Sequence, residues 1–325
     1  MNFFNRLGHI EIISGKKILF SSKGVQQYKE VINKEHLRRF YDLDFKFSCS
    51  KIVDITTTNS EASISVLGLS RETIQFLATY RPTGLEINSQ KRIRIYASYE
   101  NMGDCLIFDG DIIKAVPSLP PNNWLEITAR VGNYRATSLL SYAINGAIRL
   151  EDLIKGICEK TSLKPVYINE TSKEVMEAKK KMVHGFDCSG TLYDLLQSIN
   201  RISDFSVRED NGELICKLRD NHKVGTAKVI VLNQKTGMIG PPEILVGTVD
   251  KGAKTKDEPS TLRLKVKCFI NPNINLWNCV YVQSVYLPDV NGLYTVTEIK
   301  YNGHLRGQEW YMILTLTAAY RGGNN

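Results

Sequence analysis

The sequence predicts a β-rich α+β fold in which two similar β-barrel domains flank a small α/β domain. Alternating apolar and polar residues dominate both ends of the 325-residue chain, as half-buried strands require. The middle of the chain instead contains two segments with the i, i+3, i+4 spacing of amphipathic helices. The two β-rich ends also match each other in part, which indicates a repeated unit. These changes of pattern predict three domains, over residues 1–135, 136–225 and 226–325.

The N-terminal domain is predicted to contain five strands and one short helix. Each strand segment alternates, or is rich in β-branched and aromatic residues that suit a pleated, half-buried surface. The expected strands cover residues 43–53, 62–70, 91–99, 105–116 and 124–131. The segment RETIQFLATY, which begins at Arg71, is expected to form the helix.

The middle domain is predicted to contain two helices that share a pattern. The first set of residues is Leu150, Asp152, Leu153 and Ile157, and it recurs as Leu192, Asp194, Leu195 and Ile199. A duplicated helix-strand unit explains this match, but unrelated amphipathic helices also place Leu and Ile at these spacings. Thr191 with Asp194 is typical of a helix start, because both side chains can satisfy free backbone N–H groups.

The C-terminal domain is expected to end in a long β-hairpin over residues 291–317. Two alternating runs there flank a loop that holds Asn302-Gly303 and Arg306-Gly307. Successive strand side chains point to opposite faces. One face of the second strand is therefore predicted to pack in the core, and it carries Trp310, Met312, Leu314 and Leu316.

The first and last domains match at a constant offset of 186 residues. The matched residues are Phe108, Ile113, Lys114 and Trp124 in the first domain and Tyr294, Ile299, Lys300 and Trp310 in the last. Because no gap is needed, the match predicts a common strand-strand-hairpin barrel, although apolar matches also arise by chance in strand-rich sequence. Two similar barrels in each chain would let three subunits form a ring with approximate sixfold symmetry.

The charge balance leaves two interpretations open. Lys and Arg total 42 against 34 Asp and Glu, which gives a net charge of +8 and a pI near 9.0, so acidic partners have to be considered. Both signs are mixed along the chain, as on an ordinary solvated surface. The alternative is an OB-type nucleic-acid-binding protein with exposed aromatic platforms for base stacking. Those platforms would be Tyr96, Tyr99, Tyr281 and Trp310, which otherwise belong in a core or an interface.

No catalytic residue, metal ligand or cofactor site is predicted. The seven cysteines are scattered and never form a C-x-x-C pair, which indicates reduced thiols in a cytoplasmic setting. Residues 247–255 superficially resemble a phosphate-binding loop, but Ala253 separates Gly252 from Lys254, so an exposed turn is expected. Asp109 and Asp111 are expected in a turn at a strand end, since no further calcium ligands follow.

The chain also lacks the signals of a membrane protein. Arg6, His9 and Glu11 interrupt the apolar residues of the N-terminus, so no signal peptide is expected. No apolar run approaches the ~18 residues that would span a bilayer. We therefore expect no membrane anchor.

Long segments at both ends resemble the baseplate hub proteins of tailed bacteriophages, the tail hub or late control protein D-like family. The segments are LDFKFSCSKIVDITTTNSEASISVLGLSRETIQFLATY, which begins at Leu43, LRLKVKCFINPNINLWNCVYVQS and VNGLYTVTEIKYNGHLRGQEWYMILTL. The resemblance covers nearly the whole chain. It implies a structural homotrimer, not an enzyme, that connects the tail tube or a tube-initiator protein to the central spike and lines the DNA channel.

The resemblance further implies contacts with other baseplate proteins, DNA only in transit, assembly in the host cytoplasm and a final place in the virion. A tail-associated cell-wall hydrolase is a third possible function. The channel lining is expected to be neutral or acidic, because many phosphate contacts would hold DNA. The surplus positive charge, including Lys179–Lys181, is then expected on outer or subunit-facing surfaces.

On this interpretation the outer face and tip of the C-terminal hairpin form an assembly interface. Its expected members are Lys300, His304, Arg306, Tyr311, Thr315 and Thr317. Exposed charges contribute little to stability but can steer a partner. Tyr and Thr combine contact area with hydrogen-bonding groups, which suits an interface.

Overall fold

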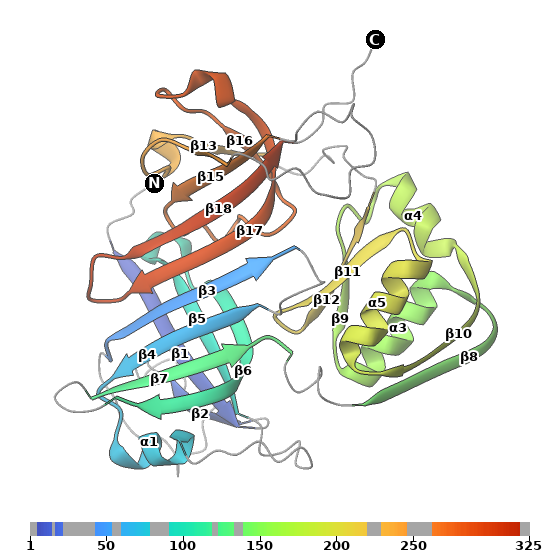
Figure 1. The fold of residues 1–325 in the computed structure, drawn as a ribbon, viewed down its shortest axis with the longest axis horizontal. Helices are drawn as coiled ribbons and strands as arrows, with labels where there is room; N and C mark the ends of the chain where they lie inside the picture. Colours follow the sequence, from blue (N-terminus) through green and yellow to red (C-terminus); the bar gives the residue numbers. More distant parts are fainter. Residues whose placement is uncertain are drawn as a thin grey trace.

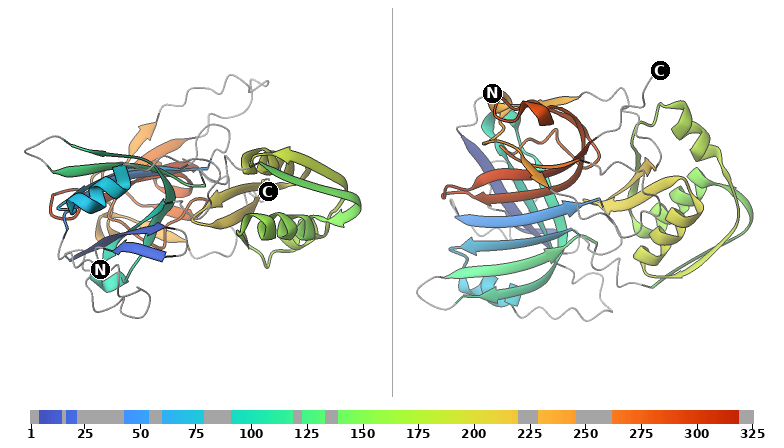
Figure 2. Two further views of the ribbon diagram at one scale, coloured as in Figure 1. Left: turned by 90° about the horizontal axis from the view of Figure 1, so that it is seen from below. Right: turned by 45° about the horizontal axis from the view of Figure 1, so that its top comes forward.

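The computed structural model describes residues 5–14, 17–21, 43–53, 60–78, 91–118, 123–132, 139–219, 229–245 and 262–318. Most of these residues lie in strands, which confirms a β-rich α+β fold. The strands of the two chain ends form one body, and residues 139–219 form a second body beside it (Figures 1 and 2).

The N-terminal half of the β-rich body confirms the five predicted strands and the predicted helix. Its elements are β1 (Arg6–Ser14), β2 (Lys17–Ser21), β3 (Phe45–Ile52), β4 (Glu61–Leu67), α1 (Arg71–Ala78), β5 (Lys91–Tyr99), η3 (Glu100–Met102), β6 (Leu106–Pro117) and β7 (Trp124–Arg130). β1 and β2 were not predicted from the sequence. In β1 the side chains of His9 and Glu11 are buried along with Ile10 and Ile12, so polarity does not mark its exposed face.

The C-terminal half confirms the predicted hairpin. Its elements are β13 (Ile230–Leu232), η4 (Gln234–Thr236), β14 (Glu243–Leu245), β15 (Arg263–Cys268), β16 (Cys279–Val282), η5 (Pro288–Val290), β17 (Gly292–His304) and β18 (Trp310–Ala318). β17 runs through Asn302 and Gly303, so the turn is shorter than predicted, because Gly303 still pairs with Trp310. The predicted core face of β18, with Trp310 at its start, is buried as expected.

The two halves share one sheet. Its order is β14-β15-β18-β17-β3-β4-β7-β6-β5-β1-β2, and β16 also pairs with β17 and with β13. The antiparallel pairing of β17 with β3 joins the halves. The ladders of the described strands do not close into a ring, so the fold differs from the prediction of two separate closed barrels.

The halves repeat a strand order, but not at the constant offset that the sequence suggests. The order β3-β4-β7-β6-β5 recurs as β14-β15-β18-β17-β16, and the pairings of β6 with β7 and of β17 with β18 each contain one register shift. However, Trp310 is 3% exposed, whereas Trp124 at the same offset is half-exposed and the buried residue beside it is Leu125. An unbroken offset of 186 therefore pairs opposite faces of β7 and β18.

The second body contains the two predicted helices. Its elements are β8 (Leu140–Arg149), α3 (Leu150–Thr161), β9 (Lys164–Tyr167), α4 (Lys173–Lys180), β10 (Met182–Gly190), α5 (Leu192–Ile202), β11 (Phe205–Asp210) and β12 (Glu213–Leu218). β8 pairs with β10, and β9 and β11 flank β12, so β8-α3-β9 and β10-α5-β11 are equivalent units. Thr191 and Asp194 form the predicted capping box at the start of α5.

The buried apolar residues form two clusters. One cluster combines both halves of the β-rich body and includes Phe45, Phe108 and Leu314. The other lies between the helices and strands of the second body and includes Leu153 and Ile199. The boundaries near residues 135 and 225 stay a prediction.

Candidate assembly surfaces

The joint between the two halves is a continuous backbone ladder. Residues 298–304 of β17 pair with residues 46–52 of β3. On the outward face the Ser48 hydroxyl lies 2.9 Å from Asn302 Oδ1. Past the strand end, the Leu305 N–H donates to the Phe45 carbonyl at 2.9 Å. Hydrogen bonds of this kind hold the hairpin on the first half without depending on particular side chains.

Trp310 fills the centre of this joint. Its indole N–H donates to the Ser98 carbonyl at 3.1 Å, and the Tyr99 hydroxyl donates to the Trp310 carbonyl at 3.3 Å. The ring of Phe47 meets the indole edge-on at 5.6 Å. Gly303 leaves room for both rings, because a Cβ there would come within 2.3 Å of Phe47. The burial of Tyr99 and Trp310 removes two of the four exposed platforms that the OB-type alternative requires.

The hairpin tip is tied to its own chain. His304 Nε2 lies 2.9 Å from Asp44 Oδ2, and the Arg306 backbone N–H donates to Asp44 Oδ1 at 3.2 Å. Arg6 also donates to the carbonyls of His304 and Gln308, at 3.1 Å each. Asp44 therefore brings together two of the six predicted interface residues. Their contact with another subunit stays a prediction.

The other four predicted residues differ in their exposure. Lys300 is exposed on β17, and Thr317 is half-exposed. Lys267 Nζ lies 3.8 Å from the centre of the Tyr311 ring, which is a cation–π contact. The Thr315 hydroxyl donates to Glu298 at 3.0 Å, and Thr315 is buried. The outer face of β18 therefore offers Tyr311 and Thr317 to a partner more readily than Thr315.

A buried charge cluster joins the second body to the β-rich body. Lys51 of β3 and Asp210 of β11 form an ion pair at 3.1 Å, and both side chains are almost fully buried. Arg208 stacks over Trp277 at 5.6 Å, and burial lowers the pKa of its guanidinium. The Asp109 backbone N–H donates to Asn211 Oδ1 at 3.1 Å. This joint was not predicted from the sequence, because its partners lie in different predicted domains.

Asp109 and Asp111 lie inside β6, so their predicted place in a turn is wrong. Both side chains are buried. Arg92 lies 2.8 Å from Asp109 and 3.9 Å from Asp111, and Arg94 lies 3.1 Å from Asp109. Cross-strand arginines thus compensate the buried carboxylates. Within the described part of the chain, no group of three or more His, Cys, Asp or Glu side chains could hold a metal ion.

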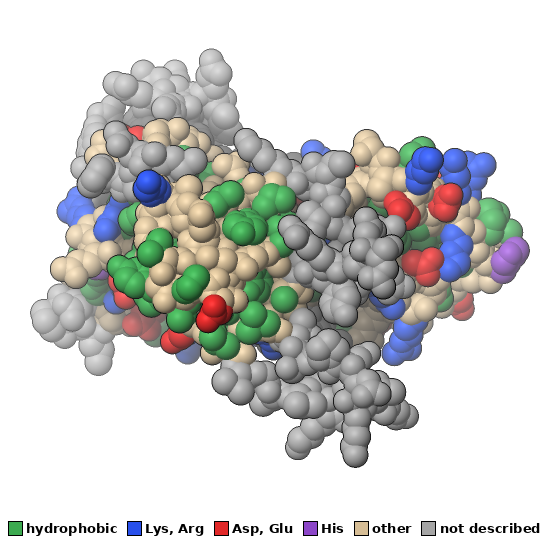
Figure 3. Space-filling model, turned by 90° about the horizontal axis from the view of Figure 1, so that it is seen from above, with side chains coloured by type: hydrophobic (Ala, Val, Ile, Leu, Met, Phe, Trp, Pro, Cys, Tyr) green, Lys and Arg blue, Asp and Glu red, His purple; other side chains and the backbone are tan. Residues whose placement is uncertain are grey.

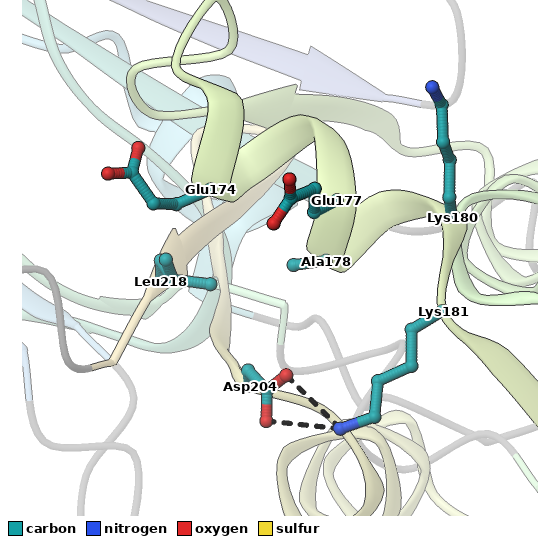
Figure 4. A pocket seen from close by; sticks show the side chains of 7 residues that line it. All are labelled: Glu174, Glu177, Ala178, Lys180, Lys181, Asp204 and Leu218. Atoms are coloured by element: carbon teal, nitrogen blue, oxygen red, sulfur yellow. Dashed lines mark hydrogen bonds and ion pairs between the residues drawn. The ribbon is translucent and has the colours of Figure 1, made fainter.

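An open groove of about 590 Å³ lies between α4 and the end of β12 (Figure 4). Its lining consists of Glu174, Glu177, Ala178, Lys180, Lys181, Asp204 and Leu218. Lys181 points to Asp204 at 3.1 Å, whereas Lys180 points away from it. Lys179 pairs with Glu151 and Glu170 at 3.1 and 2.9 Å. Two of the three lysines in this run are therefore charge-paired, and none of the described residues that line the groove is a serine, cysteine or histidine.

The buried thiols of Cys49 and Cys158 are not reactive groups. All seven cysteines are free, in agreement with the predicted reduced state. Burial raises the pKa of Cys49 to about 12 and that of Cys158 to about 11. These two thiols stay protonated near neutral pH and are poor nucleophiles. The loop over residues 247–255 and the rest of the segment around it lie outside the described residues.

A sequence profile of the family described as "Baseplate hub gp41" matches residues 31–316. The chain belongs to this baseplate hub family. Membership confirms the resemblance found in the sequence and assigns the chain to a structural component of a phage tail baseplate. A search of curated protein sequences finds no match. Among the described helices, none is both long and apolar enough to cross a membrane.

Solved structures with the same fold come from phage tails and from a secretion system. The 43 kDa tail protein of prophage MuSo2 from Shewanella oneidensis has a TM-score of 0.59 at 9% identity, over 96% of this chain and 97% of that one. A tail protein from Neisseria meningitidis MC58 has a TM-score of 0.58 at 9% identity, over 97% of both chains. The E. coli c3393 protein, a type VI secretion component described as similar to the T4 tail proteins gp27 and gp5, has a TM-score of 0.52 at 11% identity, over 86% of this chain and 74% of that one.

Proposed function

We propose that three copies of the chain form a ring with approximate sixfold symmetry at the hub of the baseplate. The repeated strand order carries this proposal, since β3-β4-β7-β6-β5 and β14-β15-β18-β17-β16 are two like units in one chain. Three such chains supply six like units. A ring of this kind lets a threefold object dock on a sixfold one.

In this role the ring connects the tail tube, or a tube-initiator protein, to the central spike and surrounds a channel for DNA. Membership of the baseplate hub family supports a place for the chain at the hub. The likeness to the E. coli protein, which is described as similar to gp27 and gp5, supports a spike partner. Other baseplate proteins would contact the outside of the ring. The chain would assemble in the host cytoplasm and remain in the virion.

The proposed role needs no catalysis. The protonated thiols of Cys49 and Cys158 support this point, as does a groove whose described lining contains no serine, cysteine or histidine. We expect the purified protein to turn over peptidoglycan and nucleotides no faster than a heat-denatured control. Peptidoglycan turnover well above that control would favour a tail-associated cell-wall hydrolase.

A channel that DNA crosses should also release DNA. Several Lys and Arg contacts to phosphate would hold the duplex and make its release salt-dependent. We therefore expect binding weaker than micromolar at physiological salt, despite the net charge of +8. Submicromolar binding that weakens steeply with salt would favour the OB-type alternative.

The copy number tests the ring. Native mass spectrometry of hubs released from tail particles should give three copies of the chain together with the spike. One copy, or six, would contradict the proposal, because only three copies of a two-unit chain supply six equivalent positions.

A further inference from the structure

The repeated strand order leaves one contact without its counterpart. Within the chain, the second half of β17 pairs with the edge of β3. In the repeat, β6 takes the place of β17, and β14 takes the place of β3. An equivalent contact would therefore pair the second half of β6 with β14. These two strands lie far apart in the sheet order of one chain, so the same chain cannot make that contact.

Among the described strands, neither edge has a further pairing partner. Residues 113–117 of β6 have β7 on one side, while the pairing of β6 with β5 stops at Asp111. β14 pairs with β15 alone among the described strands. The apolar side chains at these edges are exposed, with Val116 at 40% and Ile244 at 49%. An open edge with exposed apolar residues is a template for strand addition.

The loop from β5 to β6 and the loop from β16 to β17 are also equivalent in the repeat, and only the first of them is covered by the described residues of the other half. In the first half, Tyr99 begins the loop from β5 to β6, and its hydroxyl and ring contact Trp310 and Phe269 of the second half. In the second half, the corresponding loop from β16 to β17 spans residues 283–291 and carries Val285 and Tyr286, which are 78% and 70% exposed. Its tip has no such neighbour within the described chain.

The exposed loop is nevertheless held in one conformation. The Ser284 N–H donates to Asn291 Oδ1 at 2.6 Å, and the Asn291 amide donates back to the Ser284 carbonyl at 3.2 Å. The Leu287 N–H donates to the Ser284 hydroxyl at 3.2 Å. A fixed loop loses little conformational entropy on binding. Its apolar tip is therefore suited to docking.

The loop from β16 to β17 lies at the top of the β-rich body in Figure 1, and this end faces the viewer in Figure 3. On this face hydrophobic side chains gather over the β-rich body, and few charged side chains interrupt them. The exposed apolar residues of the C-terminal half include Val231, Tyr281, Val285, Tyr286 and Leu287. Large contiguous apolar areas on a protein surface mark interaction sites.

We propose that a second copy of the same chain covers this end, in a head-to-tail contact. In that contact β14 and the tip of the loop over residues 285–287 dock on residues 113–117 of β6 and on the start of β7 at Trp124. The contact repeats, between copies, the one that β17 and β3 make within the chain. It rests on the proposed ring and names the surfaces through which the copies meet.

The chemistry of the two edges is complementary. Ile244 lies opposite the buried Leu264, and Ala115 lies opposite the buried Ile127, so both side chains are on the core side of their sheets. Pairing of the two edges would continue the row of core-facing apolar side chains from one copy into the next. On the outward side, Lys114 is exposed, and Glu243, which already pairs with Lys265 at 3.1 Å, carries the opposite charge. The head-to-tail arrangement closes into a ring when the rotation between copies is a simple fraction of a turn.

Photo-cross-linking tests the surfaces. Benzoylphenylalanine replaces Tyr286 in the full-length chain, which is then irradiated in purified tail particles. We expect products of two and three chains, joined to the tryptic peptide 115–130, which contains Trp124. The same photo-residue at Met176, an exposed apolar position on α4, should give no such product. Cross-links between copies through a different peptide would overturn the proposed surfaces and leave the ring intact.

Two substitutions provide an independent test. Val285→Asp and Ile244→Asp place a charge on exposed positions, so the monomer should melt as the unmodified chain does. Association of the copies should weaken by at least roughly tenfold. Met176→Asp is the matched control and should leave association unchanged. Trimers that form equally well with either variant would overturn the inference, whereas the absence of any copy-copy contact in tail particles would overturn the ring itself.

Discussion

The two halves of the β-rich body share a strand order but differ in what covers them. The first half has its β3 edge and its Tyr99 loop covered by the second half, so Tyr99 is 2% exposed. Among the described residues, none of the first half covers β14 or the loop at Tyr286, and Tyr286 is 70% exposed. The halves also contribute unequally to their joint, since Trp310 is buried there and Trp124 is not. The proposed contact between copies would account for this difference, because it would give the second half the cover that the first half has within the chain.

The largest effect should come from the tryptophan at the joint. Trp310→Ala removes a buried ring that contacts both halves, and we expect it to lower the free energy of unfolding by about 3 to 5 kcal/mol. Trp124→Ala, on the half-exposed side of β7, should cost about 1 kcal/mol or less. Urea denaturation of both variants measures the difference. Equal losses of unfolding free energy would show that Trp124 and Trp310 stabilise the protein equally. The two halves would then not differ at this position.

The next-largest effect should come from the buried ion pair that joins the second body to the β-rich body. Asp210→Ala leaves Lys51 and Arg208 buried without their carboxylate, and we expect a loss of about 3 kcal/mol in unfolding free energy. The matched control is Asp204→Ala, which breaks the exposed pair with Lys181 and should cost less than about 1 kcal/mol. If both variants unfold at the same urea concentration, the buried pair does not hold the two bodies together.

A smaller effect tests the two loops directly. Tyr99→Phe removes only the hydroxyl that donates to the Trp310 carbonyl, and we expect a loss of about 1 kcal/mol. Tyr286→Phe removes an exposed hydroxyl and should leave the melting temperature of the monomer unchanged. Destabilisation of the monomer by Tyr286→Phe would mean that its loop already has a partner within the chain.

The smallest effect on folding belongs to the hairpin charges. A Lys300→Ala/Arg306→Ala double variant should change the unfolding free energy by less than about 0.5 kcal/mol, since both side chains are exposed. It should still assemble poorly, because exposed charges steer association. The control is Lys173→Ala/Lys180→Ala, which removes the same charge from α4 and should assemble normally. A double hairpin variant that unfolds early but assembles normally would reverse the predicted roles.

Local patterns in the sequence predicted the local structure. The core face that begins at Trp310 and the capping box of Thr191 with Asp194 follow from alternation and from helix-start chemistry. β1 was missed because its strand buries His9 and Glu11 as well as its isoleucines. A buried polar residue looks like a solvent-facing one until its partners are known.

Contacts between distant segments could not be predicted in this way. The pairing of β17 with β3 and the ion pair between Lys51 and Asp210 join residues with no shared local signal. The match of Trp124 with Trp310 found a repeat but assigned the wrong face, because a shift of one residue turns every side chain of a strand over. The repeat of strand order became visible only from the pairing itself.

Electron cryomicroscopy of the baseplate hub would test the proposed ring by direct observation. We expect three copies of the chain around one channel, with six β-rich lobes at nearly equal angles and the second bodies outside them. Each lobe should continue into the next through a strand pairing like that of β17 with β3. A hub with one copy or six copies of the chain, or with three copies whose β-rich halves occupy unlike positions, would contradict it.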